Sequence, residues 1–84
     1  MKELKDTIEL MNSEGYKERF KAEYWQTKLR YNSLHKMIVK CEAKTLGFEH
    51  TCPIDVLKTQ RRHMGEYLHQ LEVRAEIEEI DLEA

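Results

Sequence analysis

The apolar positions between residues 16 and 45 repeat with the spacing of one long helix. Counting from Phe20, they recur at intervals of 4, 3, 4, 3, 4, 3 and 4 residues, which is the narrow seam of a coiled-coil-like helix. Two tyrosines and a threonine lie in the middle of this seam, so we predict a helix over residues 14–45 whose packing surface carries polar groups. The seam comprises Phe20, Tyr24, Thr27, Tyr31, Leu34, Ile38, Cys41 and Thr45.

A second helical pattern starts at Pro53. Proline suits the first position of a helix, where its missing N–H is not needed, and Asp55 favours the positive end of the helix dipole. The 4, 3, 4, 3, 4 spacing then returns, which predicts a second helix over residues 53–79. Its seam comprises Leu57, Arg61, Met64, Leu68, Leu71 and Ala75.

A short arm precedes the first long helix. Leu4, Ile8 and Met11 share one helical face. A helix of this length is not stable alone in water, so we expect the arm to dock on the rest of the chain. Asn12 suits the N-cap of the long helix, with Met11 and Tyr16 as a hydrophobic staple around it.

The connection between the two long helices is short, and its Gly47 suits a left-handed cap at the end of the first helix. A short connection makes consecutive helices antiparallel neighbours. We therefore predict an all-α fold with a single domain over residues 1–84. It is an antiparallel helical hairpin of two long helices with a short N-terminal helical arm over residues 1–13.

A two-helix layer leaves apolar side chains uncovered beside its seam. A further stripe on the later helix, formed by Val73, Ile77 and Ile80, turns away from the first stripe. Trp25 and Leu29 are left uncovered in the same way on the first long helix. Covering such surface is favourable by about 25 cal/mol per Å². We therefore predict that the hairpin assembles into a homo-oligomeric helix bundle, most simply a dimer with four long helices.

Charge is unevenly distributed along the chain. Its 84 residues carry a net charge of −2, with 36% charged side chains, but residues 28–63 sum to +5 and residues 64–84 to −6. The middle of the chain is therefore expected to attract anions, whereas the net charge argues against general nucleic-acid binding. No long apolar run or signal-peptide pattern occurs, so we expect an intracellular protein with no membrane partner.

Candidate metal and catalytic chemistry is weak. Cys41 and Cys52 are expected to be free thiols in a reducing compartment. With His50 and His63 they could bind zinc, but their spacing matches no zinc motif, so we expect no metal and no cofactor. The sequence shows no nucleophile loop and no carboxylate pair of the catalytic kind, so we do not expect an enzyme.

Arg61 occupies a seam position, where arginine is rare without a partner. The hairpin register places it near Tyr31 and His35, and the facing helix has no acidic residue between Glu23 and Glu42. One interpretation is that Arg61 simply reaches to solvent. The other is a phosphate pocket in which an aromatic side chain stacks on a base.

Gly65, one helical turn beyond Arg61, supports the second interpretation. Glycine inside a helix costs about 1 kcal/mol relative to alanine, so it indicates a close approach by a partner helix or a ligand. The candidate ligand-binding residues are Arg61, Arg62, Tyr31, His35, Tyr24 and Trp25.

Three stretches of the chain carry a resemblance to a known group of proteins: YKERFKAEYWQTKLRYNSLHKM, CPIDVLKTQ and MGEYLHQLEVRAEIEEI. With them the chain resembles a family of small helical proteins encoded by gut bacteriophages and prophages, including relatives in crAss-like phages. The likeness extends over roughly residues 14–82 and is not centred on a catalytic motif. It implies a phage accessory protein that acts in the bacterial host cytoplasm.

Small phage proteins of this kind often counter host defence, and three functions follow. The first is sequestration of a phosphate-bearing nucleotide immune signal within a helical oligomer. The second is inhibition of a host defence protein by direct binding, for example as an anti-CRISPR protein. The third is a structural or regulatory phage protein without a ligand. Buried Arg and Tyr around an enclosed cavity would favour the first function, and an exposed apolar or single-sign patch would favour the second.

Overall fold

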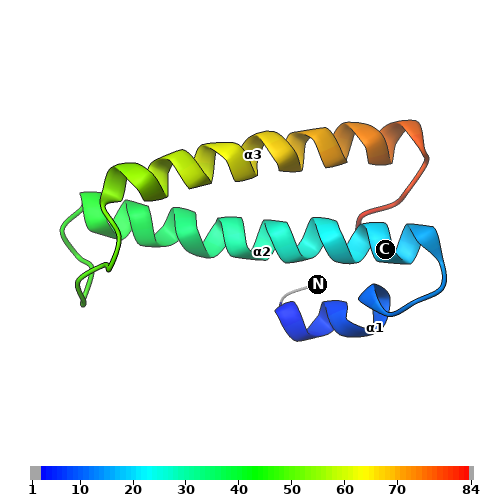
Figure 1. Ribbon diagram of the computed structural model, residues 1–84, viewed down its shortest axis with the longest axis horizontal. Coiled ribbons are helices and arrows are strands. Elements are labelled where there is room, and N and C mark those ends of the chain that lie inside the picture. Colours follow the sequence, from blue (N-terminus) through cyan, green and yellow to red (C-terminus); the bar gives the residue numbers. More distant parts are fainter. Residues whose placement is uncertain (1–2, 84) are drawn as a thin grey trace.

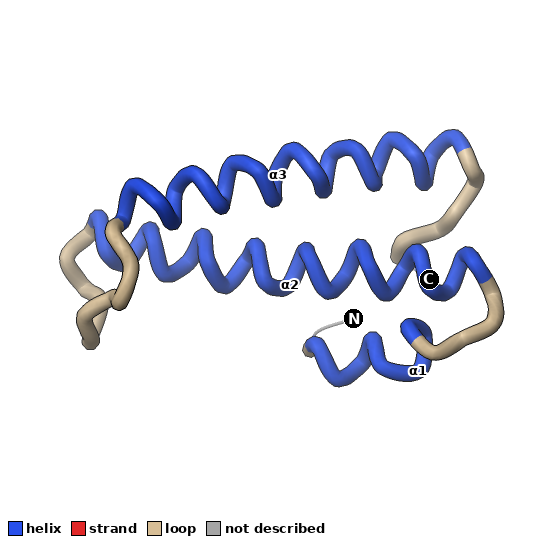
Figure 2. The backbone as a smooth tube through the Cα atoms, in the orientation of Figure 1, coloured by secondary structure: helices blue, strands red, loops and turns tan. Residues whose placement is uncertain are grey.

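The computed structural model describes residues 3–83, which form helices and no β-strand (Figures 1 and 2). A 3₁₀ helix, η1 (Leu4–Thr7), leads directly into the short helix α1 (Ile8–Met11). The two long helices are α2 (Tyr16–Glu42) and α3 (Ile54–Ile77). The prediction of an all-α chain with two packed long helices is confirmed, and both long helices end slightly inside their predicted ranges.

The two seams face each other across an antiparallel hairpin (Figure 1). Every seam position from residue 20 to 41 and from residue 57 to 75 is buried or half-buried. Burial is uneven along the hairpin, because the main core gathers in the half that lies away from the α2–α3 connection. In the connection half, Ile38 is the only fully buried side chain among the described residues. The core cluster comprises Phe20, Tyr24, Leu68, Leu71, Ala75 and Ile80.

Both long helices end in the same way. After α2, Lys44 adopts a left-handed φ of 62°, and the N–H of Thr45 donates to the carbonyl oxygen of Lys40. After α3, Glu79 has a φ of 57°, and the N–H of Ile80 donates to the carbonyl of Ala75. These are Schellman-type ends, which satisfy the last carbonyls of a helix. Gly47 was therefore the wrong choice of left-handed cap, because no glycine among the described residues has a positive φ.

The helix starts also differ in detail from the sequence prediction. The N-cap of α2 is Gly15, whose N–H donates to the side-chain oxygen of Ser13, so Asn12 is not its cap. Asn12 instead closes α1. Pro53 is the N-cap of α3 and not its first helical residue, while Asp55 lies in the first turn as expected.

The arm docks on the first half of α2 (Figure 1), although its apolar face is not the buried side. Thr7 is 1% exposed, and its hydroxyl accepts a hydrogen bond from the Gln26 side chain at 3.1 Å. Leu4, Ile8 and Met11 remain largely exposed. The η1 start rotates the chain so that Thr7 faces α2, which the α-helical spacing of the arm does not predict.

The end of the chain folds back over the core. Beyond Glu79 it turns toward α2 (Figure 1), and Ile80 is buried in the core cluster. The indole N–H of Trp25 donates to the carbonyl oxygen of Leu82 at 2.8 Å. The chain beyond Glu79 is therefore not a continuation of α3, and two of its apolar residues, Ile80 and Leu82, pack on the core.

Removing a fully buried side chain should show where the fold is held. Leu71 is 0% exposed, so Leu71→Ala is expected to lower the free energy of unfolding by about 2–5 kcal/mol. Val56, on the same helix, is 53% exposed, and Val56→Ala should change it by less than about 0.5 kcal/mol. Urea unfolding followed by circular dichroism measures both. Equal midpoints for the two variants would contradict the assigned core.

Candidate functional site

Arg61 and His35 meet across the hairpin, as the register predicted. The Nη1 group of Arg61 lies 3.1 Å from Nδ1 of His35. An arginine can only donate, so this nitrogen of His35 accepts and carries no proton in the bonded form. The imidazole therefore holds one edge of the guanidinium, and both side chains lie at the open border of the seam.

Tyr31 forms the floor beside this pair. Its ring is nearly parallel to the His35 ring, with an interplanar angle of 4° and 6.1 Å between centroids. The Lys28 ammonium lies 5.9 Å from the centre of the same ring. On α3, Gly65 faces Tyr31, and a Cβ added at Gly65 would lie 3.5 Å from the tyrosine ring. That is an ordinary contact distance, so the hairpin itself has room for alanine at this position.

The charge of Arg61 is not neutralised within the described chain. Its side chain forms no ion pair with any acidic group of residues 3–83. A guanidinium has five N–H donors, and the bond to His35 uses one of them. Arg62, the next residue, is exposed and likewise has no ion-pair partner in the described residues. The pair thus presents unused donors and positive charge beside an aromatic ring.

Tyr24 and Trp25 lie apart from this cluster, in the main core. Tyr24 is 5% exposed, and its hydroxyl donates to Glu72 at 2.7 Å. Burial raises the pKa of the Tyr24 phenol, and the bond to the Glu72 carboxylate raises it further. Trp25 packs edge-on against Tyr24 and donates its indole N–H to Leu82. The hydroxyl of Tyr24 therefore joins α2 to α3, and the indole of Trp25 holds the end of the chain.

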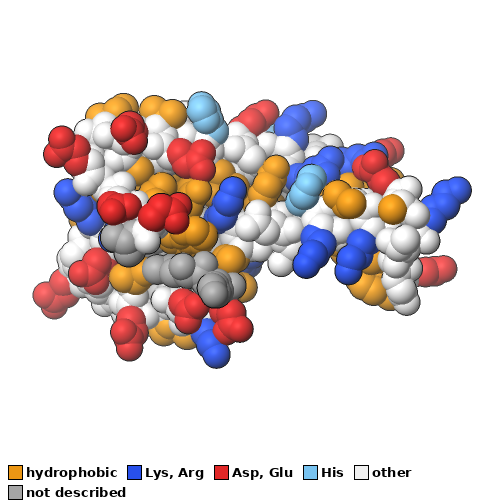
Figure 3. All heavy atoms as spheres, turned by 180° about the vertical axis from the view of Figure 1, so that it is seen from behind, with side chains coloured by type: hydrophobic (Ala, Val, Ile, Leu, Met, Phe, Trp, Pro, Cys, Tyr) orange, Lys and Arg blue, Asp and Glu red, His pale blue; other side chains and the backbone are white. Residues whose placement is uncertain are grey.

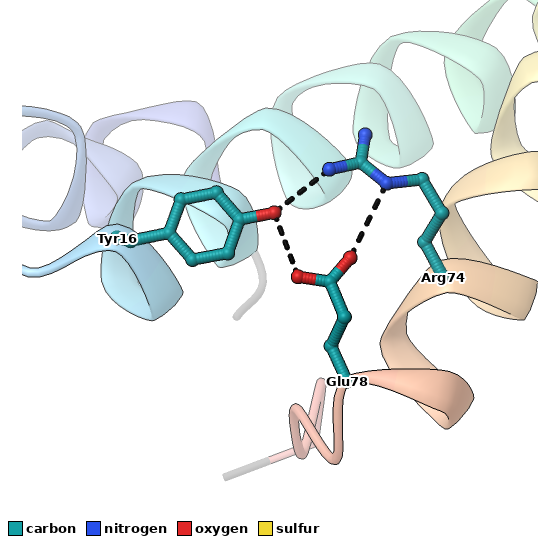
Figure 4. A network of polar contacts seen from close by, with 3 residues as sticks. All are labelled: Tyr16, Arg74 and Glu78. Carbon is teal, nitrogen blue, oxygen red and sulfur yellow. Dashed lines mark hydrogen bonds and ion pairs between the residues drawn. The ribbon is translucent and has the colours of Figure 1, made fainter.

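A polar network at the far end of the hairpin was not predicted from the sequence. Arg74 donates to the Tyr16 hydroxyl at 2.7 Å, and that hydroxyl donates to Glu78 at 2.9 Å (Figure 4). Arg74 also pairs with Glu78 and lies 4.9 Å over the Phe20 ring. The spacing of Arg74 and Glu78 along one helix was the available signal, whereas Tyr16 comes from the opposite end of the chain. The network clamps the start of α2 to the end of α3.

Charge is segregated along the hairpin. Acidic side chains gather over the end that carries the termini, and basic side chains gather toward the α2–α3 connection (Figure 3). Arg61 belongs to the basic side of this division. Among residues 3–83 no group of three His, Cys, Asp or Glu side chains could hold a metal ion. Cys41 and Cys52 are both free thiols.

The family is identified by comparison with known proteins. The sequence model of the Sequestin family matches residues 14–77, which include both long helices and the Arg61 cluster. The chain belongs to the Sequestin family. No curated protein and no solved structure matches the chain. The name Sequestin is consistent with a sequestering role and with binding of some partner. The family match does not extend to the arm or to the end of the chain beyond Ile77.

One further observation concerns membranes. None of the helices in the described part of this Sequestin chain combines the length and the apolar character that crossing a bilayer requires.

The environment of Tyr24 predicts a loss of stability in alkali. An unfolded tyrosine ionises near pH 10, and the raised pKa keeps the folded phenol protonated beyond that pH. The stabilisation is therefore complete below about pH 10 and is lost as pH rises toward the folded pKa. Thermal unfolding between pH 8 and about 11 should show this fall.

Tyr24→Phe should unfold at a lower temperature at neutral pH, because the bond to Glu72 is lost, but its stability should fall less steeply in alkali. Tyr67 has a pKa raised by its bond to Glu23 and by burial, so part of the slope should remain. Tyr31→Phe is the control, since the Tyr31 hydroxyl bonds to no carboxylate of residues 3–83. An unchanged slope in Tyr24→Phe would contradict the assignment.

Gly65 gives a second prediction. Because the added Cβ meets Tyr31 only at ordinary contact distance, Gly65→Ala should stabilise the isolated chain by about 0.5–1 kcal/mol, the gain of alanine over glycine within a helix. Thermal unfolding at low protein concentration measures this gain. A destabilised variant would show that the hairpin, and not a bound partner, requires glycine here.

Proposed function

We propose that this protein binds and sequesters a phosphate-bearing nucleotide immune signal within a helical homo-oligomer. In this proposal it is a phage accessory protein that counters defence in the bacterial host cytoplasm, and it acts by binding and not as an enzyme. The observation that carries the proposal is Arg61, a seam arginine that His35 orients and that no carboxylate of the described chain neutralises.

The chemistry of the cluster suits a phosphate. A guanidinium presents paired N–H donors that match two phosphate oxygens, and such charge-assisted bonds are about twice as strong as neutral ones. The bond to His35 fixes the guanidinium plane before a ligand arrives, so less side-chain freedom is lost on binding. The Tyr31 ring beside it offers a stacking face for a base, a contact worth about 1–3 kcal/mol.

Sequestration requires that the ligand be covered. In a single chain Arg61 is only half-buried and His35 is exposed, so a second copy is needed to enclose whatever binds there. Gly65 leaves space beside the Tyr31 ring of the same chain, at a position where the hairpin would accept alanine, so a ligand stacked on that ring has room next to α3. The family name agrees with a sequestering role.

A second candidate function is supported by a different surface. Ile77 on α3 is 75% exposed and lies among acidic residues. A single-sign patch with an apolar centre is typical of a surface that binds another protein. On this basis the chain would inhibit a host defence effector by direct contact, as an anti-CRISPR protein does.

The decisive experiment is nucleotide binding by Arg61 variants. Native mass spectrometry after incubation with a mixture of nucleotide signals should identify the bound species and its stoichiometry, and calorimetry then gives its affinity. Arg61→Ala removes two charge-assisted bonds, worth roughly 3 kcal/mol together, and should weaken binding at least about a hundredfold. Arg61→Lys keeps the charge but loses the paired donors, so its loss should be smaller.

Lys5→Ala is the matched control, since it removes one positive charge from an exposed pair on the arm and should leave affinity unchanged. Circular dichroism checks that helical content is retained in every variant. The proposal fails if wild-type protein binds no nucleotide, or if Arg61→Ala binds as tightly as wild type. Inhibition of a defence protein by direct contact would then be the better interpretation.

A further inference from the structure

One face of α2 is only half covered. The arm packs on the first half of α2 (Figure 1), and its start, at Glu3 and Leu4, lies beside Leu29. Beyond the arm the same face continues toward the α2–α3 connection as an open groove over residues 29–40. A hollow of about 770 Å³ lies where the groove meets the end of the arm, and a second of about 320 Å³ lies where it meets the connection. Both are lined by Ser33 and Lys36.

The groove combines an apolar floor with a basic rim. Its floor includes Leu29 and Met37, and Phe48, 63% exposed, stands at its far end. The positive charges on its rim have no ion-pair partner among residues 3–83. These charges belong to Arg30, Lys36 and Lys40.

The outer face of α3 has the opposite character. Val73 and Ile77 project from it and are exposed. Glu66 and Glu76 lie on the same face by helical spacing and are both exposed. Glu76 has no ion-pair partner in the described chain, and the only one for Glu66 is His63, at 4.0 Å. Residues 66–77 thus form an acidic ridge, and its apolar crest consists of Val73 and Ile77.

We propose that the groove on α2 binds the acidic ridge on α3 of a second copy of this chain. Groove and ridge have equal length, because residues 29–40 and residues 66–77 each span roughly 16 Å of helix. The apolar crest matches the apolar floor, and the unpaired carboxylates match the unpaired cations of the rim. This is the helix-in-groove mode of recognition.

The free surface of the chain agrees with such a contact. Its accessible surface is 6219 Å², whereas a folded monomer of 10.1 kDa typically exposes about 5300 Å². The difference, on the order of 900 Å², is comparable to what one partner buries in a standard protein–protein interface.

The arm of a second copy is a weaker candidate for the groove. Its exposed residues Leu4, Ile8 and Met11 are apolar, but its charges are mixed and internally used. Glu3 pairs with Lys5 and also bonds with Asp6 in a capping box. The ridge on α3 supplies carboxylates that are not already engaged in this way.

The placement of the two surfaces sets the symmetry. The groove lies on the side of α2 that faces away from α3, and the ridge lies on the side of α3 that faces away from α2. A single pair of rigid copies cannot make both contacts reciprocally, so the contact is head-to-tail and produces a closed ring or an open filament. Assemblies larger than a dimer follow. This inference is independent of whether the Arg61 cluster binds a nucleotide.

Mixing two charge-reversed variants tests the contact. The groove variant carries Lys36→Glu and Lys40→Glu, and the ridge variant carries Glu66→Lys and Glu76→Lys. Each alone lacks one half of the contact and should be monomeric at micromolar concentration, whereas wild type should be larger than a dimer. Their mixture should assemble again, because the groove of one variant and the ridge of the other are intact and the two reversed surfaces are also opposite in charge. Native mass spectrometry reads out each species.

Control variants separate the contact from general charge effects. Lys21→Glu, outside the groove, and Glu14→Lys, before α2, should assemble as wild type does, and circular dichroism should show native helicity throughout. A monomeric wild type, assembly of either charge-reversed variant alone, or a monomeric mixture would overturn the proposal. The proposal would also be overturned if Ile8→Glu abolished assembly while the ridge variant still assembled. The arm of the second copy would then be the occupant of the groove. Nucleotide binding, measured separately, can fail without affecting any of these outcomes.

Discussion

A layer of two helices can bury only one stripe of each helix, and most features of this chain follow from that constraint. The stripe on α2 and the stripe on α3 meet in the hairpin. The apolar side chains outside these two stripes must be covered in some other way. At one end the chain covers them by itself, since Thr7 of the arm and Ile80 beyond α3 are both buried there. At the other end Ile38 is the sole fully buried side chain of the described residues, so more of the apolar surface there stays uncovered.

The hairpin itself was predictable because its periodicity is a property of local sequence. The spacing of the two seams fixed which sides face each other, and the register then brought Arg61 to His35. Helix ends were less predictable. Lys44 takes the left-handed position expected of Gly47, at a cost of roughly 1–2 kcal/mol for a side chain with a Cβ. Hydrogen bonds to the last carbonyls of α2 offset that cost, and no local sequence pattern predicts these bonds.

The site was predictable in part for the same reason. Tyr31 and His35 lie on the facing helix at the level of Arg61, so helical spacing alone places them together. Tyr24 and Trp25 share the aromatic character that suggested a base platform, but Tyr24 bonds to Glu72 of α3 and Trp25 to Leu82 of the returning end of the chain. That return depends on the left-handed φ of Glu79. Tertiary contacts set this conformation, so helical periodicity does not predict it. The contact of Tyr16 with Arg74 joins opposite ends of the chain, so no local sequence pattern predicts it either.

The segregation of charge connects the two proposals. The basic half of the hairpin is also the loosely packed half, so uncompensated charge and uncovered apolar surface occur together there. An anion at Arg61 and an acidic ridge in the groove would neutralise different cations on different faces of α2, so ligand and partner do not compete for the same groups. His35 and Lys36 are neighbours in sequence, and their side chains point about 100° apart on one helix, so ligand and partner approach α2 from different directions.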